Sequence, residues 1–156
     1  IVDGELFVTA APRFRHQEVV MNCAEILRGL ARAHDLGKVV GGPVTVHLHD
    51  EGVVEPDVIF VRADRLGIVH PDGGVHGPPD LVVEVLSPTN RDYDRTLKRK
   101  LYMAHGVAEL WIVDADEGTV EVWRPGTRAP EEVRDVLAWR VGGHRFEISI
   151  EELFRG

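Results

Sequence analysis

Apolar positions in the first half of the chain follow two spacings. Between His16 and His34 they recur every three to four residues, which predicts an amphipathic helix. Alternating or short apolar runs predict strands at residues 4–9, 44–48, 57–61 and 81–86. Glycine and proline crowd residues 67–79, which we therefore expect to form a surface loop. The helical stripe consists of Val19, Val20, Cys23, Ile26, Leu27, Leu30 and Ala31.

The second half of the chain continues with a helix and several strands. The helix is expected from about Asn90 to His105, where Gly106 ends it. Residues 110–114 and 119–123 flank a turn at Gly118 and predict a hairpin, and two shorter strands are expected near 133–140 and 145–148. Ser149 opens a Ser-x-x-Glu capping box on a last helical turn. Interleaved helices and strands predict an α/β fold, a mixed sheet flanked by helices, with an additional C-terminal β-hairpin region.

Composition narrows the class of protein. A chain of 156 residues, 44% hydrophobic and 28% charged, fits one globular domain over residues 1–156. No apolar stretch approaches the roughly 18 to 20 residues of a membrane helix, so no membrane anchor is expected. Cys23 is the only cysteine, which excludes an internal disulfide and favours a reducing, cytoplasmic setting. Because the chain starts at Ile1 without a methionine, we expect further sequence to precede it.

One carboxylate stands inside an apolar strand, in the run LVVEVL at 81–86. Strand residues point alternately to opposite faces, so Glu84 shares its face with Val82 and Leu86. Burying an ionised carboxylate without a partner costs several kcal/mol. We therefore expect Glu84 to have an arginine or lysine partner, a proton or a metal ion.

Two aspartates open apolar strands in the same way. Asp57 follows Pro56, and Asp80 begins the strand that carries Glu84. If the strands of Asp57 and Glu84 are neighbours, their carboxylates can converge on Mg²⁺, which prefers one or two carboxylates together with water and phosphate oxygens. The alternatives are a turn or cap role for either aspartate, and a structural ion pair for Glu84.

Together these residues carry a family resemblance. The runs PDVIFV (56–61), PDLVVEVLSPTNRDYD (79–94) and ELWIVD (109–114), with Lys98, Tyr102 and Gly106-Val107 between them, resemble the Uma-type restriction endonuclease family of the PD-(D/E)XK nuclease superfamily. The resemblance implies a restriction-endonuclease-like core. It also implies that Asp57 and Glu84 are the acidic residues of the motif and that the backbone carbonyl of Val85 is a third metal ligand.

One position departs from that motif. The motif's lysine belongs at position 86, where this chain has Leu86, and relatives with the same gap are thought to supply the lysine from the following helix. Leu97, Leu101 and Ala104 are expected to form that helix's sheet-facing stripe. Lys98 precedes a tyrosine by four residues, as in the family, which selects it over Lys100. The alternative for Lys98 is an exposed lysine paired with Asp94.

The resemblance also implies a mechanism and a partner. Mg²⁺, or Mn²⁺ in its place, would activate a water for phosphodiester hydrolysis, and Lys98 would orient that water or stabilise developing charge. Glu18 and Asp80 are candidate accessory residues. The net charge of −8 argues against a surface that binds nucleic acid everywhere but permits a local basic patch. We expect nucleic acid, in particular DNA, as the partner, a homodimer formed through the late strands, and backbone contacts from Arg91, Arg95, Arg99 and Lys100.

Two rival interpretations stay open. The pair His47 and His49 on one strand face would suit a zinc hydrolase, although no third ligand falls at a recognisable zinc spacing. A protein that keeps the fold but has lost activity would act as a binding or interaction module, and Leu86 is its best support.

Overall fold

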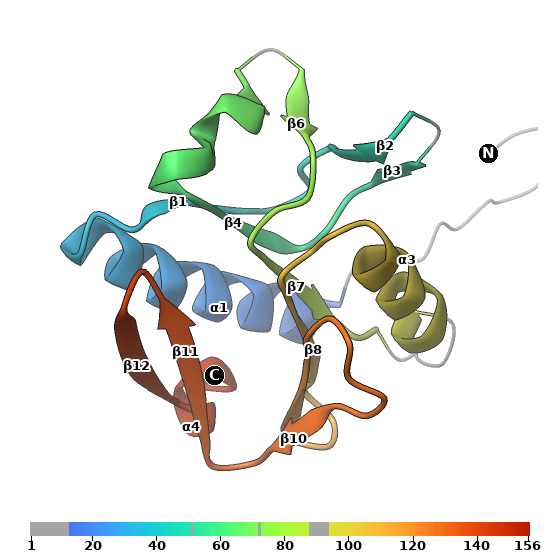
Figure 1. Ribbon diagram of the computed structural model, residues 1–156. Helices are drawn as coiled ribbons and strands as arrows, with labels where there is room; N and C mark the ends of the chain where they lie inside the picture. The colour runs from blue at the N-terminus through green and yellow to red at the C-terminus, as the bar shows by residue number, and fades with distance from the viewer. Residues whose placement is uncertain (1–12, 51, 72, 88–93) are drawn as a thin grey trace, which may run out of the picture.

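The fold is seen in a computed structural model that describes residues 13–50, 52–71, 73–87 and 94–156 (Figure 1). The strand expected at 4–9, the first residues of the helix expected from Asn90, and Arg91 lie outside the described residues. The first helix, α1 (Phe14–Ala33), forms as predicted and buries Val19, Val20, Cys23, Leu27 and Ala31.

The predicted mixed sheet is confirmed. Its strand order is β1-β4-β7-β8-β9-β10; β7 pairs parallel with β8, and every other pair in it is antiparallel. Because parallel neighbours need a crossover, the chain between β7 and β8 passes through a π-helical turn (Asp94–Lys98) and α3 (Arg99–Ala104). The strands are β1 (Gly37–Gly41), β4 (Val58–Arg62), β7 (Leu81–Val85), β8 (Glu109–Asp114), β9 (Thr119–Trp123) and β10 (Glu131–Val133).

One face of this sheet packs against α1, a C-terminal hairpin and a short helix. The hairpin pairs β11 (Val136–Val141) with β12 (His144–Ser149), as the sequence predicted for this region, and α4 (Ile150–Leu153) follows. Trp139 of the hairpin meets Phe60 edge-on at 5.2 Å between ring centroids. Apolar contacts join all three elements to the sheet in one core.

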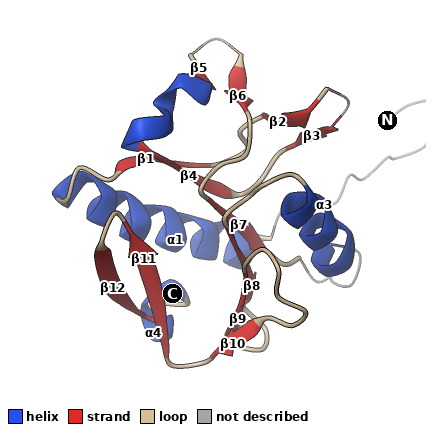
Figure 2. Cartoon of the chain, in the orientation of Figure 1, coloured by secondary structure: helices blue, strands red, loops and turns tan. Residues whose placement is uncertain are grey.

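The other face carries α3 and a second, four-stranded sheet ordered β3-β2-β6-β5 (Figure 2). These strands are β2 (Val46–His49), β3 (Gly52–Val54), β5 (Val69–His70) and β6 (Gly74–His76), and a 3₁₀ helix (Ala63–Ile68) links β4 to β5. Each face of the central sheet is therefore covered. Within the described ranges, no helix has the length and apolarity needed to cross a membrane.

Two local predictions need correction. Residues 67–79 are not only loop, because β5 and β6 lie within them and β6 pairs parallel with β2. Gly74 permits this pairing: its φ is +80°, and a Cβ there would lie 2.5 Å from the carbonyl oxygen of Thr45. The capping box at Ser149 does not form, since its side chain makes no cap hydrogen bond and Glu152 pairs with Arg155.

Candidate active site

The register between β4 and β7 brings the two predicted carboxylates together. These strands are antiparallel neighbours with Val58 opposite Val83, so one step further along the register sets Asp57 opposite Glu84. The expected alternation also holds: Val83 and Val85 belong to the core on the α1 side, and Val82 and Leu86 to the core on the α3 side. Glu84 therefore projects toward α3.

Glu84 is buried, with 5% of its surface exposed, and both of its oxygens are engaged. Lys98 donates from Nζ to Oε2 at 3.2 Å, and the Tyr102 hydroxyl donates to Oε1 at 2.5 Å. Burial raises the pKa of Glu84 to about 7, the Lys98 charge opposes this rise, and the nearby Asp57 charge adds to it. The carboxylate is thus poised near neutral pH between its charged and neutral forms.

The helix that supplies Lys98 turns a different face to the sheet than predicted. Leu97 is 48% exposed and Ala104 is exposed, whereas Tyr102 is fully buried and Leu101 is partly buried. The π-helical turn explains the error, because its i→i+5 hydrogen bonds change the angle between successive side chains. As a result Lys98 and Tyr102 face the sheet. Lys100 is exposed.

Asp57 contacts a backbone group of β7 and a histidine that the sequence analysis missed. Its Oδ2 accepts a 2.8 Å hydrogen bond from the amide of Val85. His16 lies with Nε2 2.9 Å from the carbonyl oxygen of Val85 and 3.7 Å from Oδ2 of Asp57. The available signal was its position: His16 precedes Val20 and Cys23 by four and seven residues, on the apolar stripe of α1.

Glu18 and Asp80 lie apart from this group. Glu18 is about 200° around α1 from His16 at 100° per residue, and it pairs with Arg15. Asp80 accepts a hydrogen bond from the amide of Arg62 and pairs with Arg65 at 2.9 Å. It precedes Glu84 by four strand residues, or about 13 Å. Through these contacts Asp80 ties the start of β7 to the end of β4 and to the helical turn that follows it.

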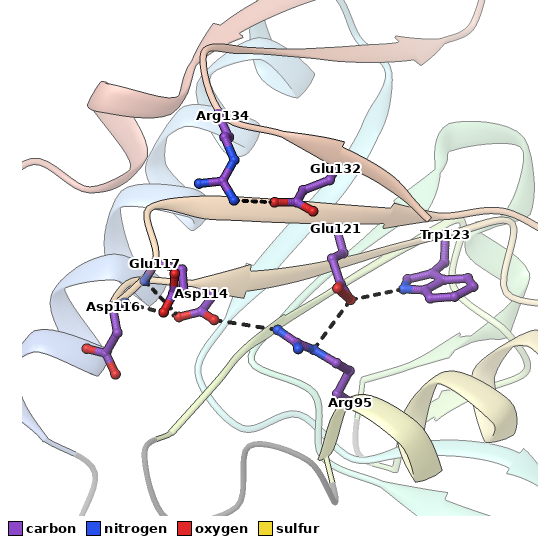
Figure 3. Close-up of polar contacts among 8 residues, drawn as sticks. All are labelled: Arg95, Asp114, Asp116, Glu117, Glu121, Trp123, Glu132 and Arg134. Atoms are coloured by element: carbon purple, nitrogen blue, oxygen red, sulfur yellow. Dashed lines mark hydrogen bonds and ion pairs between the residues drawn. The ribbon is translucent and has the colours of Figure 1, made fainter. Parts of the chain in front are cut away.

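Two residues of the predicted cationic group, Arg95 and Arg99, make contacts within the protein. Arg95 points toward both Asp114 and Glu121 (Figure 3). Its guanidinium lies 3.5 Å from Oδ2 of Asp114 and 3.5 Å from Oε1 of Glu121. The guanidinium of Arg99 stacks over Trp123 at 4.5 Å. Arg95 therefore ties the helix to β8 and β9, and its charge is balanced by two carboxylates before any nucleic acid approaches.

His47 and His49, the pair considered as zinc ligands, each pack against a different histidine. His47 stacks on His76 at 4.3 Å between ring centroids, and His49 packs on His105 at 4.4 Å. Across the residues that the structure describes, no group of three or more His, Cys, Asp or Glu side chains is arranged to hold a metal ion. The geometry thus gives no support to a zinc hydrolase.

Three oxygen donors fit a hard cation better. They are the carboxylates of Asp57 and Glu84 and the carbonyl of Val85, which come from neighbouring strands. Mg²⁺ needs only one or two carboxylates, with water and substrate filling its other positions. The negative charges of Asp57 and Glu84 repel each other, and a bound cation would relieve this repulsion.

The raised pKa of Glu84 predicts an unusual pH dependence of stability in the metal-free protein. The unfolded chain releases this proton near pH 4.5, whereas the folded protein holds it up to about pH 7. Stability contributed by Glu84 should therefore fall as the pH rises from 4.5 to 7 and stay low above it. The Glu84→Gln variant should lose this pH dependence in melting curves recorded with chelator, and Glu25→Gln, at an exposed helical position, should keep it. A Glu84→Gln variant that melts with the wild-type pH dependence would contradict this assignment.

Two comparisons with known proteins find a match to this chain. Residues 1–148 match a family model described as "Uma2: Putative restriction endonuclease". A search of curated proteins finds no match. One similar solved structure is described as a "putative nuclease belonging to DUF820" from Anabaena variabilis ATCC 29413. It is 20% identical, has a TM-score of 0.76, and the similarity covers 98% of this chain and 87% of the other. At this identity the likeness establishes the fold.

Proposed function

Because the chain belongs to the Uma2 family of restriction-endonuclease-like proteins, we propose that it is a metal-dependent endonuclease that hydrolyses phosphodiester bonds in nucleic acid, with DNA as its substrate. The observation that carries this proposal is the 3.2 Å contact between Lys98 and Glu84. It supports a site in which a helix supplies the lysine that the strand lacks at Leu86.

The metal would be held by Asp57, Glu84 and the carbonyl of Val85. A divalent ion bound by these groups would supply a more acidic water and would withdraw charge from the phosphate. The mixed carboxylate and carbonyl donors suit Mg²⁺ and also Mn²⁺.

The protein's own groups would position and stabilise the reacting atoms. The Lys98 ammonium would orient the attacking water or stabilise negative charge that develops on the phosphate oxygens. Tyr102, fully buried, holds Oε1 of Glu84 by its hydroxyl and so fixes the direction of the carboxylate. Arg99 and Lys100 could contact the nucleic-acid backbone, which would position the strand without reading its sequence.

Cleavage of supercoiled DNA, linear DNA and RNA with Mg²⁺ or Mn²⁺ tests the proposal. We expect cleavage of at least one DNA substrate, its loss with chelator, and its loss in the Asp57→Ala and Glu84→Ala variants. Equal cleavage by wild type and both variants would point to a contaminating nuclease and overturn the assignment. Metal binding without cleavage of any substrate would favour the inactive binding module instead.

We also propose a homodimer, joined through the strands of the late hairpin region. The outer strand β10 pairs with β9 on one side, and an edge strand can pair with a second copy. Light scattering at several concentrations tests this, because a molecular mass of about 17 kDa throughout would exclude it.

A further inference from the structure

Three neighbouring strands each present a carboxylate to the side of the central sheet that α3 covers. Ile112 of β8 lies opposite both Glu84 of β7 and Glu121 of β9, and it belongs to the core on the α3 side. Asp114, two residues further along β8, points to the same side because alternate strand residues share a face. Glu84 and Asp114 are buried. A row of carboxylates of this kind requires cations close by.

The helical segment over this row supplies two of these cations, Lys98 and Arg95. Lys98 contacts Glu84 at 3.2 Å. Nη2 of Arg95 lies 3.5 Å from Oδ2 of Asp114, and its Nε, which is buried, lies 3.5 Å from Oε1 of Glu121. Figure 3 shows the Arg95 side chain extending from the helical turn toward both strands. The rotation of the turn that gives Arg95 its partners is therefore the one that gives Lys98 its own.

The two carboxylates that Arg95 contacts are themselves held by the sheet. Oδ1 of Asp114 accepts two backbone amides of the turn after β8, each at 3.1 Å. Oε1 of Glu121 accepts a hydrogen bond from Nε1 of Trp123 at 3.4 Å. Asp114 is only 2% exposed, so water screens its attraction to Arg95 less than it screens an exposed pair. Arg95 thus fastens the helical segment to groups whose directions are already set.

This fastening matters because the apolar residues of the segment do not set its rotation. In a regular helix the apolar spacing would turn Leu97 toward the sheet, yet Leu97 is 48% exposed. Arg95 is the second residue of the π-helical turn, a rare backbone geometry, and Lys98 is the last. A contact outside the apolar stripe must therefore favour the observed rotation, and the contacts of Arg95 are of that kind.

We propose that Arg95 is a positioning residue for the cleavage reaction: its contacts with β8 and β9 hold the π-helical turn in the rotation that brings Lys98 to Glu84. The inference rests on the proposed function, and it gives Arg95 a different role from the backbone contact that the sequence predicts. A backbone contact strengthens substrate binding, whereas a positioning contact affects the chemical step through Lys98. Measurements of KM and kcat therefore separate the two roles.

Steady-state cleavage of DNA at saturating Mg²⁺ tests the role of Arg95. We expect Arg95→Met to lower kcat about tenfold or more, because a small misplacement of a reacting group is costly, and to leave KM and its salt dependence unchanged. Arg95→Lys keeps the charge and should show the same pattern with a smaller loss of kcat. Arg95→Met should add no further loss to Lys98→Met, since both changes act through the same ammonium group.

Arg134→Met is the matched control. Arg134 borders the same polar cavity as Arg95, but it is exposed and pairs with Glu132 (Figure 3). This variant should cleave as the wild type does, and far-ultraviolet circular dichroism confirms that each variant is folded. An unchanged kcat in both Arg95 variants, with or without a raised KM, would overturn the inference. Losses that add in the double variant would also overturn it, because Arg95 would then act independently of Lys98.

The ammonium group of Lys98 can also be observed without metal or substrate. In the isotope-labelled, metal-free protein its contact with Glu84 should slow proton exchange and give an ammonium signal in proton–nitrogen spectra, which Lys98→Met lacks. We expect Arg95→Met to lose this signal and Arg134→Met to keep it. Persistence of the signal in Arg95→Met would overturn the inference, and cleavage by the wild type would still support the proposed function. If the wild type gives the signal but cleaves no substrate, the proposed function fails, and loss of the signal in Arg95→Met still shows that Arg95 places Lys98.

Discussion

Replacing Lys98 with methionine should slow cleavage by about 10²- to 10³-fold, the usual effect of removing one group that stabilises transition-state charge. Nζ of Lys98 lies 3.2 Å from Glu84, and the described part of its helix offers Lys100, which is exposed, as the other lysine. Because the Lys98 charge lowers the pKa of Glu84, its loss should raise that pKa and let protons compete with metal near neutral pH. Rates should therefore be measured at about pH 9, with saturating Mg²⁺.

Lys38→Met is a suitable control for this experiment. Lys38 is exposed on the outer strand β1, with β4 between that strand and β7. The control should cleave at the wild-type rate. Full activity in Lys98→Met would show that the lysine missing from position 86 is not replaced by Lys98, and the mechanism would need another cation.

Introducing the motif's lysine directly, as Leu86→Lys, should destabilise the protein by about 3–5 kcal/mol. Leu86 is 7% exposed and lies in the apolar cluster that includes Val82, Ile112 and Tyr102. A lysine there would lose the apolar burial and place an ammonium group among these side chains. Urea unfolding of the metal-free protein measures the effect as a lower midpoint.

Leu97→Lys provides the matched comparison for Leu86→Lys. Leu97 is 48% exposed on the turn that precedes α3, so a lysine there should change the free energy of unfolding by no more than about 0.5 kcal/mol. Equal stability of Leu86→Lys and the wild type would mean that position 86 accepts a charge. The absence of the motif's lysine would then have no packing explanation.

Strand periodicity was enough to predict how Glu84 is placed. A period of two assigns each residue of β7 to a face without knowledge of its neighbours, and the assignment holds in both cores. Whether the strands of Asp57 and Glu84 are neighbours was left open by the sequence, and the β4–β7 pairing shows that they are. A carboxylate on the apolar face of a strand was the informative anomaly, because its burial demands a compensating group.

The rotation of the helix after β7 could not be predicted in this way. A period of 3.6 residues placed Leu97 and Ala104 toward the sheet, but the π-helical turn shifts the facing ridge to Lys98 and Tyr102. Both side chains satisfy the buried carboxylate of Glu84. The side of the helix that faces the sheet is therefore set by contacts with β7, and the periodicity of the local sequence does not reveal it.

Short strands and long-range charge pairs were missed for a related reason. β5 and β6 hold two and three residues, too few to show a period, and they form because β6 pairs with β2. Arg95 resembled a free cation in the sequence, yet it lies between Asp114 and Glu121, which are 19 and 26 residues further along the chain. His16 was hidden in the same way, since Val85 is distant in sequence.

The most direct measurement is anomalous diffraction from a crystal of the protein grown with Mn²⁺. The account predicts one anomalous peak between Asp57 and Glu84, within about 2.0–2.6 Å of an oxygen of each carboxylate and of the Val85 carbonyl. Absence of a peak there at saturating Mn²⁺, with Lys98 still 3.2 Å from Glu84, would contradict it. Glu84 would then be a structural ion pair, and the protein would not be a metal-dependent nuclease of this kind.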